Sequence, residues 1–229
     1  MTPTPQAGVT PPVRVAGFAS GGGTNLQALL DHETADGPYH IVVVISDREG
    51  AGALGRAEAA GRLARVIEVK GRPSEEVATE TLALLESLEV QAIFLSGYLR
   101  MIPAAVVSAY RRRILNIHPA LLPAFGGKGM FGPHVHEAVL STGAEVSGAT
   151  VHYADEEYDT GTIVGQWSVP VLPGDDARSL AARVLSVEHR LYPAVADHVC
   201  RAWAKGRVPD PFALSLMELG SDLKQDPPS

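Results

Sequence analysis

The sequence predicts a single α/β domain built on a mostly parallel, doubly wound sheet, with an antiparallel strand pair toward its C-terminal end. Strand-like and helix-like segments alternate from residue 13 to residue 118, which favours parallel strands covered by helices on both faces. Two β-rich runs then follow closely at 148–155 and 162–172, a spacing typical of an antiparallel pair. A long helical stretch begins near residue 176.

The individual elements follow from local patterns. The run IVVVIS at 41–46 is apolar throughout, as expected for a strand buried on both faces. The segment 73–88 begins with Pro-Ser and early acids, which is typical of a helix start. Pro193 is expected to kink or break the last helix, and Gly206 to end it. The other strands are expected at 13–19, 64–69, 91–97 and 113–118, and the other helices at 25–31 and 52–60.

The chain's 229 residues fit one domain, which we expect to span residues 13–210. Residues 1–12, rich in Pro and Thr, are expected to be a disordered leader, and residues 211–229 a C-terminal tail. Apolar residues make up 45% of the chain and charged residues 20%, as in ordinary globular proteins.

The bulk composition also favours some partners over others. A formal net charge of −7 argues against nucleic acid as the main partner. A single cysteine, Cys200, cannot form an internal disulfide, and no apolar run approaches the roughly 20 residues that span a bilayer. We therefore predict a cytoplasmic protein with no nucleic-acid or membrane partner. A homodimer is compatible with the sequence, which does not fix the oligomeric state.

A glycine-rich stretch, SGGGTN, stands where the first strand passes to the first helix. Gly22, Gly23, Thr24 and Asn25 are expected to cradle a phosphate at the helix N-terminus. The alternative is a tight turn in which Thr24 or Asn25 caps the helix. Leu26 stands where a dinucleotide fingerprint needs its third glycine, and no Gly-Lys-Ser/Thr loop is present. A phosphorylated small molecule therefore fits better than NAD or ATP.

A polar pair interrupts the apolar run at 113–118. Side chains alternate along a strand, so Asn116 and His118 project from one face, and Pro119 ends the strand directly after them. At the carboxyl end of a parallel strand that face opens onto the crevice where such sheets bind ligands. An amide beside an imidazole can stabilise an oxyanion and move a proton. The alternative is a pair that only satisfies backbone groups of the loop.

An acidic turn lies between the last two predicted strands. It contains Asp155, Glu156, Glu157 and Asp159, with Gly161 expected to allow the chain reversal. Acids in a connection are usually just solvated, but the pattern G-x-T-V-x-Y-x-x-E-x-Y-D-x-G at 148–161 is specific.

Four segments together resemble the folate-dependent formyltransferases, most closely the members of purine synthesis that act on phosphoribosylglycinamide (GAR). They are SGGGTNLQALL (20–30), SGYLRMI (96–102), LNIHPALLP (115–123) and GATVHYADEEYDTGTIVGQ (148–166), and the similarity runs from about residue 13 to residue 206. The resemblance implies a Rossmann-like formyltransferase fold. It also implies transfer of a formyl group from the co-substrate 10-formyltetrahydrofolate to the amino group of GAR, without a metal.

The resemblance further implies roles for particular residues. Asn116 would hold the formyl oxygen, His118 would act as the acid, and Asp159 would raise the pKa of the histidine. A carboxylate about 4 Å from an imidazolium attracts it by about 4 kcal/mol at an effective dielectric near 20, so we expect His118 to be charged near neutral pH. The implied substrate contacts are Gly23, Thr24 and Asn25 for the GAR phosphate; Leu185, Ser186, Val187 and Glu188 for GAR; and Leu99, Arg100, Met101, Ile102, Asn116, Ala154, Asp155 and Glu156 for folate.

Several residues keep a second interpretation. Glu188 lies on an otherwise apolar helix stripe and would otherwise be a helix-edge carboxylate paired with an arginine. His152 is either a supporting group for Asp159 or a satisfied strand histidine. His134 and His136 form an H-x-H pair that, with His118 and Asp159, would be a weak zinc signal.

The glycine-rich segment 124–133 is longer than in the family pattern, and the sequence suggests a lid over the folate, an anchor for its acidic tail, or a passive insertion. Two rival functions share the same chemistry or fold: a formyltetrahydrofolate deformylase, which is a hydrolase, and a catalytically silent homologue that binds phosphorylated metabolites.

Overall fold

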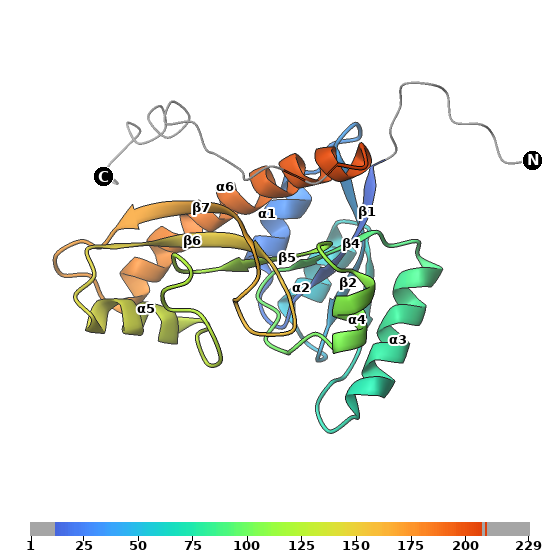
Figure 1. Cartoon of the computed structure of the whole chain (residues 1–229), viewed down its shortest axis with the longest axis horizontal. Coiled ribbons are helices and arrows are strands. Elements are labelled where there is room, and N and C mark those ends of the chain that lie inside the picture. Colours follow the sequence, from blue (N-terminus) through green and yellow to red (C-terminus); the bar gives the residue numbers. More distant parts are fainter. Residues whose placement is uncertain (1–11, 208, 210–229) are drawn as a thin grey trace, which may run out of the picture.

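The computed structural model describes residues 12–207 and residue 209. The predicted leader, apart from residue 12, and the predicted tail at 211–229 lie outside the described residues. Seven strands form one sheet, shown in Figure 1. They are β1 (Val13–Phe18), β2 (Tyr39–Ser46), β3 (Leu63–Val66), β4 (Ala92–Leu95), β5 (Ile114–His118), β6 (Val146–Tyr153) and β7 (Ile163–Pro170).

The strand order is β3-β2-β1-β4-β5-β6-β7. The first five strands pair in parallel, and β6 pairs antiparallel with both β5 and β7. The chain leaves β1 toward β2 on one side and later returns to β4 on the other. The carboxyl ends of β1 and β4 therefore flank the topological switch point, where open α/β sheets bind ligands.

Helices cover both faces of this sheet (Figure 1). They are α1 (Thr24–His32), α2 (Gly52–Ala59), α3 (Ser74–Ser87), α4 (Ala104–Ala109), α5 (Pro133–Ser141) and α6 (Ala177–Ala204). One core cluster joins the sheet to α1, α2, α5 and α6, and the other joins it to α3 and α4. The prediction of a doubly wound, mostly parallel sheet with an antiparallel C-terminal pair is confirmed. Among the described residues no helix is both long and apolar enough to cross a bilayer.

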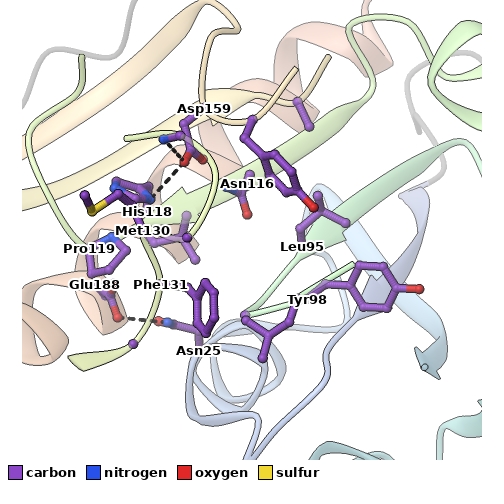
Figure 2. A pocket seen from close by; sticks show the side chains of 18 of the residues that line it. Asn25, Leu95, Tyr98, Asn116, His118, Pro119, Met130, Phe131, Asp159 and Glu188 are labelled. Carbon is purple, nitrogen blue, oxygen red and sulfur yellow. Dashed lines mark hydrogen bonds and ion pairs between the residues drawn. The ribbon is translucent and has the colours of Figure 1, made fainter. Parts of the chain in front are cut away.

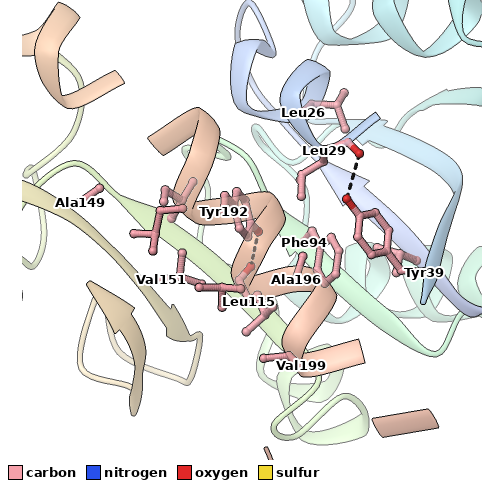
Figure 3. Packing of buried hydrophobic residues seen from close by; sticks show 14 of the residues in the cluster. Leu26, Leu29, Tyr39, Phe94, Leu115, Ala149, Val151, Tyr192, Ala196 and Val199 are labelled. Atoms are coloured by element: carbon pink, nitrogen blue, oxygen red, sulfur yellow. Dashed lines mark hydrogen bonds between the residues drawn. The ribbon is translucent and has the colours of Figure 1, made fainter. Parts of the chain in front are cut away.

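Two buried tyrosines fasten the face that carries α1 and α6 (Figure 3). The Tyr192 hydroxyl of α6 lies 3.1 Å from the carbonyl oxygen of Leu95 and 3.0 Å from that of Leu115. Tyr39 of β2 donates to the carbonyl of Leu29 in α1 at 2.9 Å. Because a buried hydroxyl needs a partner, these bonds fix α1 and α6 against the sheet.

Some local predictions are wrong. The last helix does not break at Pro193, because α6 continues from Ala177 to Ala204 with that proline buried inside it. Packing of its apolar stripe against the sheet outweighs the loss of one backbone hydrogen bond. The third strand ends at Val66 rather than at residue 69. The helices α4 and α5 were not expected, and the sequence directly before α5 is rich in glycine.

Candidate active site

A cavity of about 870 Å³ opens at the carboxyl ends of the parallel strands (Figure 2). Its walls come from the first turn of α1, the segments after β4 and β5, the β6–β7 hairpin and one face of α6. The loops after β1 and β4 are tied together at this place, because the Leu99 N–H donates to Ser20 Oγ at 2.9 Å. The predicted polar residues from distant parts of the sequence converge on this one cavity.

The polar pair of β5 lies where the sequence predicts it. Asn116 and His118 both line the cavity, and Pro119 follows at the end of the strand. The antiparallel partner β6 places His152 directly opposite Asn116, and Thr150 opposite His118. Cross-strand neighbours on one face are within contact distance of one another, so β6 adds a second imidazole to the site.

The environment of His118 fixes which ring nitrogen carries its proton. Nε2 lies 2.8 Å from the carbonyl oxygen of Phe125, which can only accept, so Nε2–H is the donor. Phe125 has a positive φ of 56°, an uncommon backbone conformation for a non-glycine residue. Nδ1 faces Asp159 Oδ2 at 3.6 Å, beyond hydrogen-bond distance. The neutral ring therefore presents the lone pair of Nδ1, and a second proton would bind there, beside the carboxylate.

The predicted charge on His118 needs correction. Burial lowers the pKa of His118, and this effect outweighs the raising effects of the Asp159 carboxylate and the Phe125 carbonyl, so the net pKa lies below 6.5. The imidazole is only 3% exposed, and removing it from water disfavours its charged form. The expectation that Asp159 keeps this ring protonated near neutral pH is wrong, although Asp159 does act in that direction.

Asp159 occupies the hairpin between β6 and β7 with a positive φ of 59°. Burial acts to raise its pKa, but His152, His118 and the Gly127 N–H lower it below the usual value. The Gly127 N–H donates to Oδ2 at 2.9 Å. Gly161 has no positive φ. Instead a Cβ there would collide with the carbonyl oxygen of Tyr153, so glycine permits close approach of the two strands rather than the turn itself.

His152 connects the amide to the acid. Its Nδ1 lies 2.9 Å from the carbonyl oxygen of Tyr153, which requires Nδ1–H as donor. In the neutral ring Nε2 then accepts from Asn116 Nδ2 at 3.0 Å, and it lies 3.5 Å from Asp159 Oδ1. The ring is 1% exposed. Sequence reasoning favoured a satisfied strand histidine at position 152, because the supporting role depends on its register opposite Asn116.

The segment after β4 and the start of the hairpin form one wall. Leu99, Arg100, Met101, Ile102, Ala154 and Asp155 line the cavity as their predicted folate contacts require, whereas Glu156 is exposed and lies outside the lining. The side chains of Leu99 and Met101 are 43% and 40% exposed, so they present apolar surface at the cavity mouth. Met130 and Phe131 of the glycine-rich segment also line the cavity (Figure 2).

Asp47, at the end of β2, anchors this wall. Arg100 Nε donates to Asp47 Oδ2 at 2.9 Å, and Arg48 binds both carboxylate oxygens. Burial alone would raise the pKa of Asp47, but hydrogen bonds from Arg48, Ser20 and Arg100 together lower it to about 2. The ionised carboxylate holds the segment after β4 in position.

The first turn of α1 lies at the other end of the cavity from the wall that Leu99–Ile102 form. Gly23 is the N-cap residue with φ +73°, and a Cβ there would lie 2.7 Å from Ala53 Cβ, so only glycine fits. No side chain caps the helix, which rules out Thr24 or Asn25 as its cap. Its first-turn N–H groups thus remain a place where an anion would be favoured. Asn25 lines the main cavity, whereas Thr24 lines a second cavity.

Glu188 of α6 meets Asn25 across the cavity floor (Figure 2). Its Oε2 accepts from Asn25 Nδ2 at 2.9 Å, so the predicted alternative of an arginine partner is wrong. Burial raises the pKa of Glu188 to about 7, because the carboxylate is 6% exposed. Leu185 also lines the cavity. Ser186 is exposed and Val187 is in the core, since a helix turns consecutive residues to different sides.

Within residues 12–207 and 209, no group of three or more His, Cys, Asp and Glu side chains is arranged to hold a metal ion. His134 is exposed at the start of α5, where it lies 3.5 Å from Glu137. His136 instead lines the main cavity, and its buried Nδ1 has no hydrogen-bond partner. The two histidines of the H-x-H pair therefore face different surroundings.

Comparison with known proteins identifies the class to which this fold and site belong. Residues 13–196 match the family model described as formyl transferase. The chain belongs to this family.

Particular relatives make the comparison more specific. A Vigna unguiculata protein is named "Phosphoribosylglycinamide formyltransferase, chloroplastic" and is 41% identical over 86% of this chain. The match spans 64% of that protein's length. The phosphoribosylglycinamide formyltransferase of Escherichia coli K12 is 34% identical over 82% of this chain and 92% of its own. The crystal structure of the Brucella melitensis enzyme of that name is 42% identical, with a TM-score of 0.75 over 86% of this chain and 98% of that one.

Proposed function

We propose that the protein transfers a formyl group from 10-formyltetrahydrofolate to the amino group of 5′-phosphoribosylglycinamide, a reaction of purine synthesis. The observation that supports this proposal most strongly is the meeting of Asn116, His118 and Asp159 at the wall of one large cavity. The names of relatives that match most of the chain point to the same reaction.

The two substrates would enter from opposite ends of the cavity. Folate would lie against Leu99–Ile102 and the hairpin residues Ala154 and Asp155, with its formyl group beside Asn116 and with Glu156 outside the lining. GAR would lie against the first turn of α1, with its phosphate near Gly23, Thr24 and Asn25. On α6 its sugar would meet Leu185 and Glu188, while Ser186 and Val187 support that turn of the helix from outside the lining. The amine of GAR then approaches the formyl carbon between the two groups of residues.

The neutral resting state of His118 suggests a proton path. The amine nitrogen attacks the formyl carbon, and the carbonyl electron pair moves onto the formyl oxygen. Asn116 donates one amide N–H to that oxygen, while its other N–H remains bonded to His152. His118 Nδ1 takes the proton that the amine loses and returns it to N10 as the bond between carbon and N10 breaks. The products are formylated GAR and tetrahydrofolate, and no proton is gained or lost overall.

Asp159 would make this proton transfer favourable. When Nδ1 becomes protonated, the imidazolium lies 3.6 Å from the carboxylate. The attraction at such a distance is about 4 kcal/mol at an effective dielectric near 20. A well-placed donor such as the Asn116 amide adds about 3 kcal/mol of transition-state stabilisation. We therefore assign Asn116 to the oxyanion, His118 to proton transfer and Asp159 to stabilising the transient imidazolium.

The experiment that tests the proposal follows a labelled formyl group. The protein is mixed with 10-[¹³C]formyltetrahydrofolate, with and without GAR, and the products are identified by NMR. We expect the label to appear on GAR, and only when GAR is present. Labelled formate released without GAR would identify a deformylase instead, and intact substrate in both mixtures would identify a silent binding protein.

The wider context also remains at the level of proposal. We propose a cytoplasmic protein that needs no metal and binds two small molecules, in line with the net negative charge. The Vigna unguiculata relative is named as chloroplastic. A homodimer stays a prediction.

A further inference from the structure

Three residues of the segment 148–166 have no role in the proposed chemistry: Gly148, Thr150 and Gln166. Thr150 of β6 pairs with His118 of β5 on one side and with Gln166 of β7 on the other. Residues that pair across adjacent strands project from the same face of a sheet. The three strands lie side by side in Figure 1, so these side chains form one row that runs from His118 to the edge of the sheet.

The loop that follows β5, residues 119–125, crosses this row. Its Leu122 N–H donates to Thr150 Oγ1 at 3.0 Å, and the Thr150 hydroxyl donates to the carbonyl of Ala120 at 2.6 Å. Gln166 Nε2 donates to the carbonyl of Leu122 and to Thr150 Oγ1, each at 2.9 Å. These hydrogen bonds fasten the loop to both β6 and β7.

The Thr150 hydroxyl uses its full hydrogen-bonding capacity in this arrangement. A hydroxyl can donate one hydrogen bond and accept two, and Thr150 does both. Gly148 leaves room for the same loop, since a Cβ there would lie 2.7 Å from Leu121 Cδ2. Thr150 is buried, whereas Gln166 is exposed on the edge strand. Gln166 can therefore be substituted without opening the core.

The far end of the loop sets the tautomer of His118. The carbonyl of Phe125 accepts the hydrogen bond from His118 Nε2 at 2.8 Å. The Asp159 carboxylate favours a proton on Nδ1, the nitrogen that faces it at 3.6 Å. The carbonyl of Phe125 opposes this preference, because it holds the proton of the neutral ring on Nε2. Nδ1 thus keeps its lone pair, as the proposed proton transfer requires.

We propose that Gln166, two strands away from His118, is a positioning residue for that ring. Its hydrogen bond to Leu122 holds the 119–125 loop so that the carbonyl of Phe125 keeps the imidazole in the Nε2–H tautomer. The effect of this arrangement on catalysis rests on the proposed function. Its structural part, the control of the tautomer, can be measured on the protein without substrates.

The test uses one substitution in β7 and a matched control in the same strand. Gln166→Met removes both N–H donors and keeps a side chain of similar length. Ser168→Ala is the control, because Ser168 is exposed two residues further along β7 and projects from the same face. Both substitutions lie at the surface of the protein, so both variants are expected to fold.

The kinetic effect of Gln166→Met should fall on kcat. We expect kcat to drop by about tenfold to a hundredfold, the loss expected when a catalytic group is misplaced by about 1 Å. The KM values for GAR and folate should stay within about twofold of wild type, because Gln166 lies outside the lining of the main cavity. Ser168→Ala should match wild type in kcat and in both KM values.

Nitrogen NMR reports the tautomer directly. The protein is labelled with [¹⁵N]histidine and studied without substrates at about pH 8, where the ring is neutral because the pKa of His118 lies below 6.5. A His118→Gln sample identifies the signals of this ring. We expect the Nε2–H tautomer in wild type and in Ser168→Ala, and a large share of the Nδ1–H tautomer in Gln166→Met. A residue that only stabilises the fold would leave the tautomer unchanged.

A double-mutant cycle tests the connection through Thr150. If both residues hold the same loop, adding Gln166→Met to Thr150→Val should lower kcat by a smaller factor than Gln166→Met does in wild type. Because Thr150 is buried, circular dichroism checks that Thr150→Val folds. If it does not fold, the kinetics and NMR of Gln166→Met decide the proposal on their own.

The outcomes separate this proposal from the proposed function. An unchanged His118 tautomer in Gln166→Met would overturn the positioning role, whatever the kcat of the variant. A changed tautomer with wild-type kcat would overturn the link between the tautomer and catalysis. A changed tautomer in a protein whose wild type shows no GAR-dependent transfer would overturn the proposed function and leave the control of His118 by Gln166 standing.

Discussion

The two halves of the sheet supply different kinds of groups to the same cavity. The parallel half, from β1 to β4 with α1, offers backbone N–H groups and a segment held from behind by Asp47. The antiparallel half, from β5 to β7, offers four polar side chains that contact one another: Asn116, His118, His152 and Asp159. Binding surfaces thus dominate one half and proton chemistry the other.

The pairing direction explains this difference. Parallel strands bring their carboxyl ends to a common edge, so their loops surround a ligand there. An antiparallel neighbour instead sets residues of two strands directly opposite, as with Asn116 and His152. The hairpin that follows then returns Asp159 to both imidazoles.

The largest effects are expected from the antiparallel half. His118→Ala and Asp159→Ala should each lower kcat by about a thousandfold while KM values change little, because both remove transition-state stabilisation. Steady-state kinetics with circular dichroism as a check on folding would measure this. Near-wild-type turnover in either variant would remove the residue from the mechanism.

Two substitutions of His152 distinguish its hydrogen bond to Asn116 from its packing alone. Gln places an acceptor oxygen near the position of Nε2, whereas Asn reaches only the position of Nδ1. We expect His152→Asn to lower kcat by about tenfold to a hundredfold and His152→Gln to recover much of it, since a lost hydrogen bond typically costs about 1–3 kcal/mol. If both variants lose the same activity, His152 does not orient the amide.

We expect Glu188 to reduce the stability of the protein near neutral pH while it contributes to GAR binding. Its folded pKa of about 7 exceeds the ordinary 4.5, so the native state holds the proton more tightly than the unfolded state. The contribution of Glu188 to stability is therefore full below about pH 4.5 and is lost as the pH rises toward 7. Glu188→Gln should raise the free energy of unfolding at pH 8 by about 3 kcal/mol, and by little at pH 4. Denaturant titrations at both pH values measure this, and GAR binding should weaken in the same variant.

A substitution of Asp47 tests whether this carboxylate holds the segment after β4 in position. Its folded pKa of about 2 lies below the ordinary 3.8, so its ionised form stabilises the native state. That contribution is full above about pH 4 and is lost as the pH falls toward 2. Asp47→Asn should lower the free energy of unfolding at pH 7 by about 2 kcal/mol and raise the KM for folate a few-fold. An unchanged KM would show that Arg100 does not need this anchor.

Much of this arrangement could be predicted from the sequence. Continuous apolar runs and helix starts gave the strands and most helices, and the alternation along β5 placed Asn116 and His118 on one face. Elsewhere tertiary packing outweighed the local sequence signals. Pro193 stays inside α6 because the surrounding helix packs along its whole length, and α5 begins within a segment that reads as a glycine-rich loop.

The finer features of the site depend on tertiary contacts that a sequence pattern does not contain. The role of His152 follows from strand register, and the carbonyl of Phe125 reaches His118 only through a loop with an unusual backbone conformation. The balance that sets the pKa of His118 needs its burial as well as its charged neighbour, which is why the motif alone predicted the wrong protonation state. Residue types could be predicted, but their electrostatic surroundings could not.

The most direct test of the account is the pH dependence of kcat/KM for folate at saturating GAR, in wild type and in Asp159→Asn. If neutral His118 accepts the proton, the wild-type rate should be level near neutral pH and fall only in acid, as Nδ1 becomes protonated below pH 6.5. Removing the Asp159 charge lowers the pKa of His118 further, so the acid limb of the variant should move to lower pH. A rate that is highest in acid and falls as the pH rises through 6–7 would contradict a neutral proton acceptor.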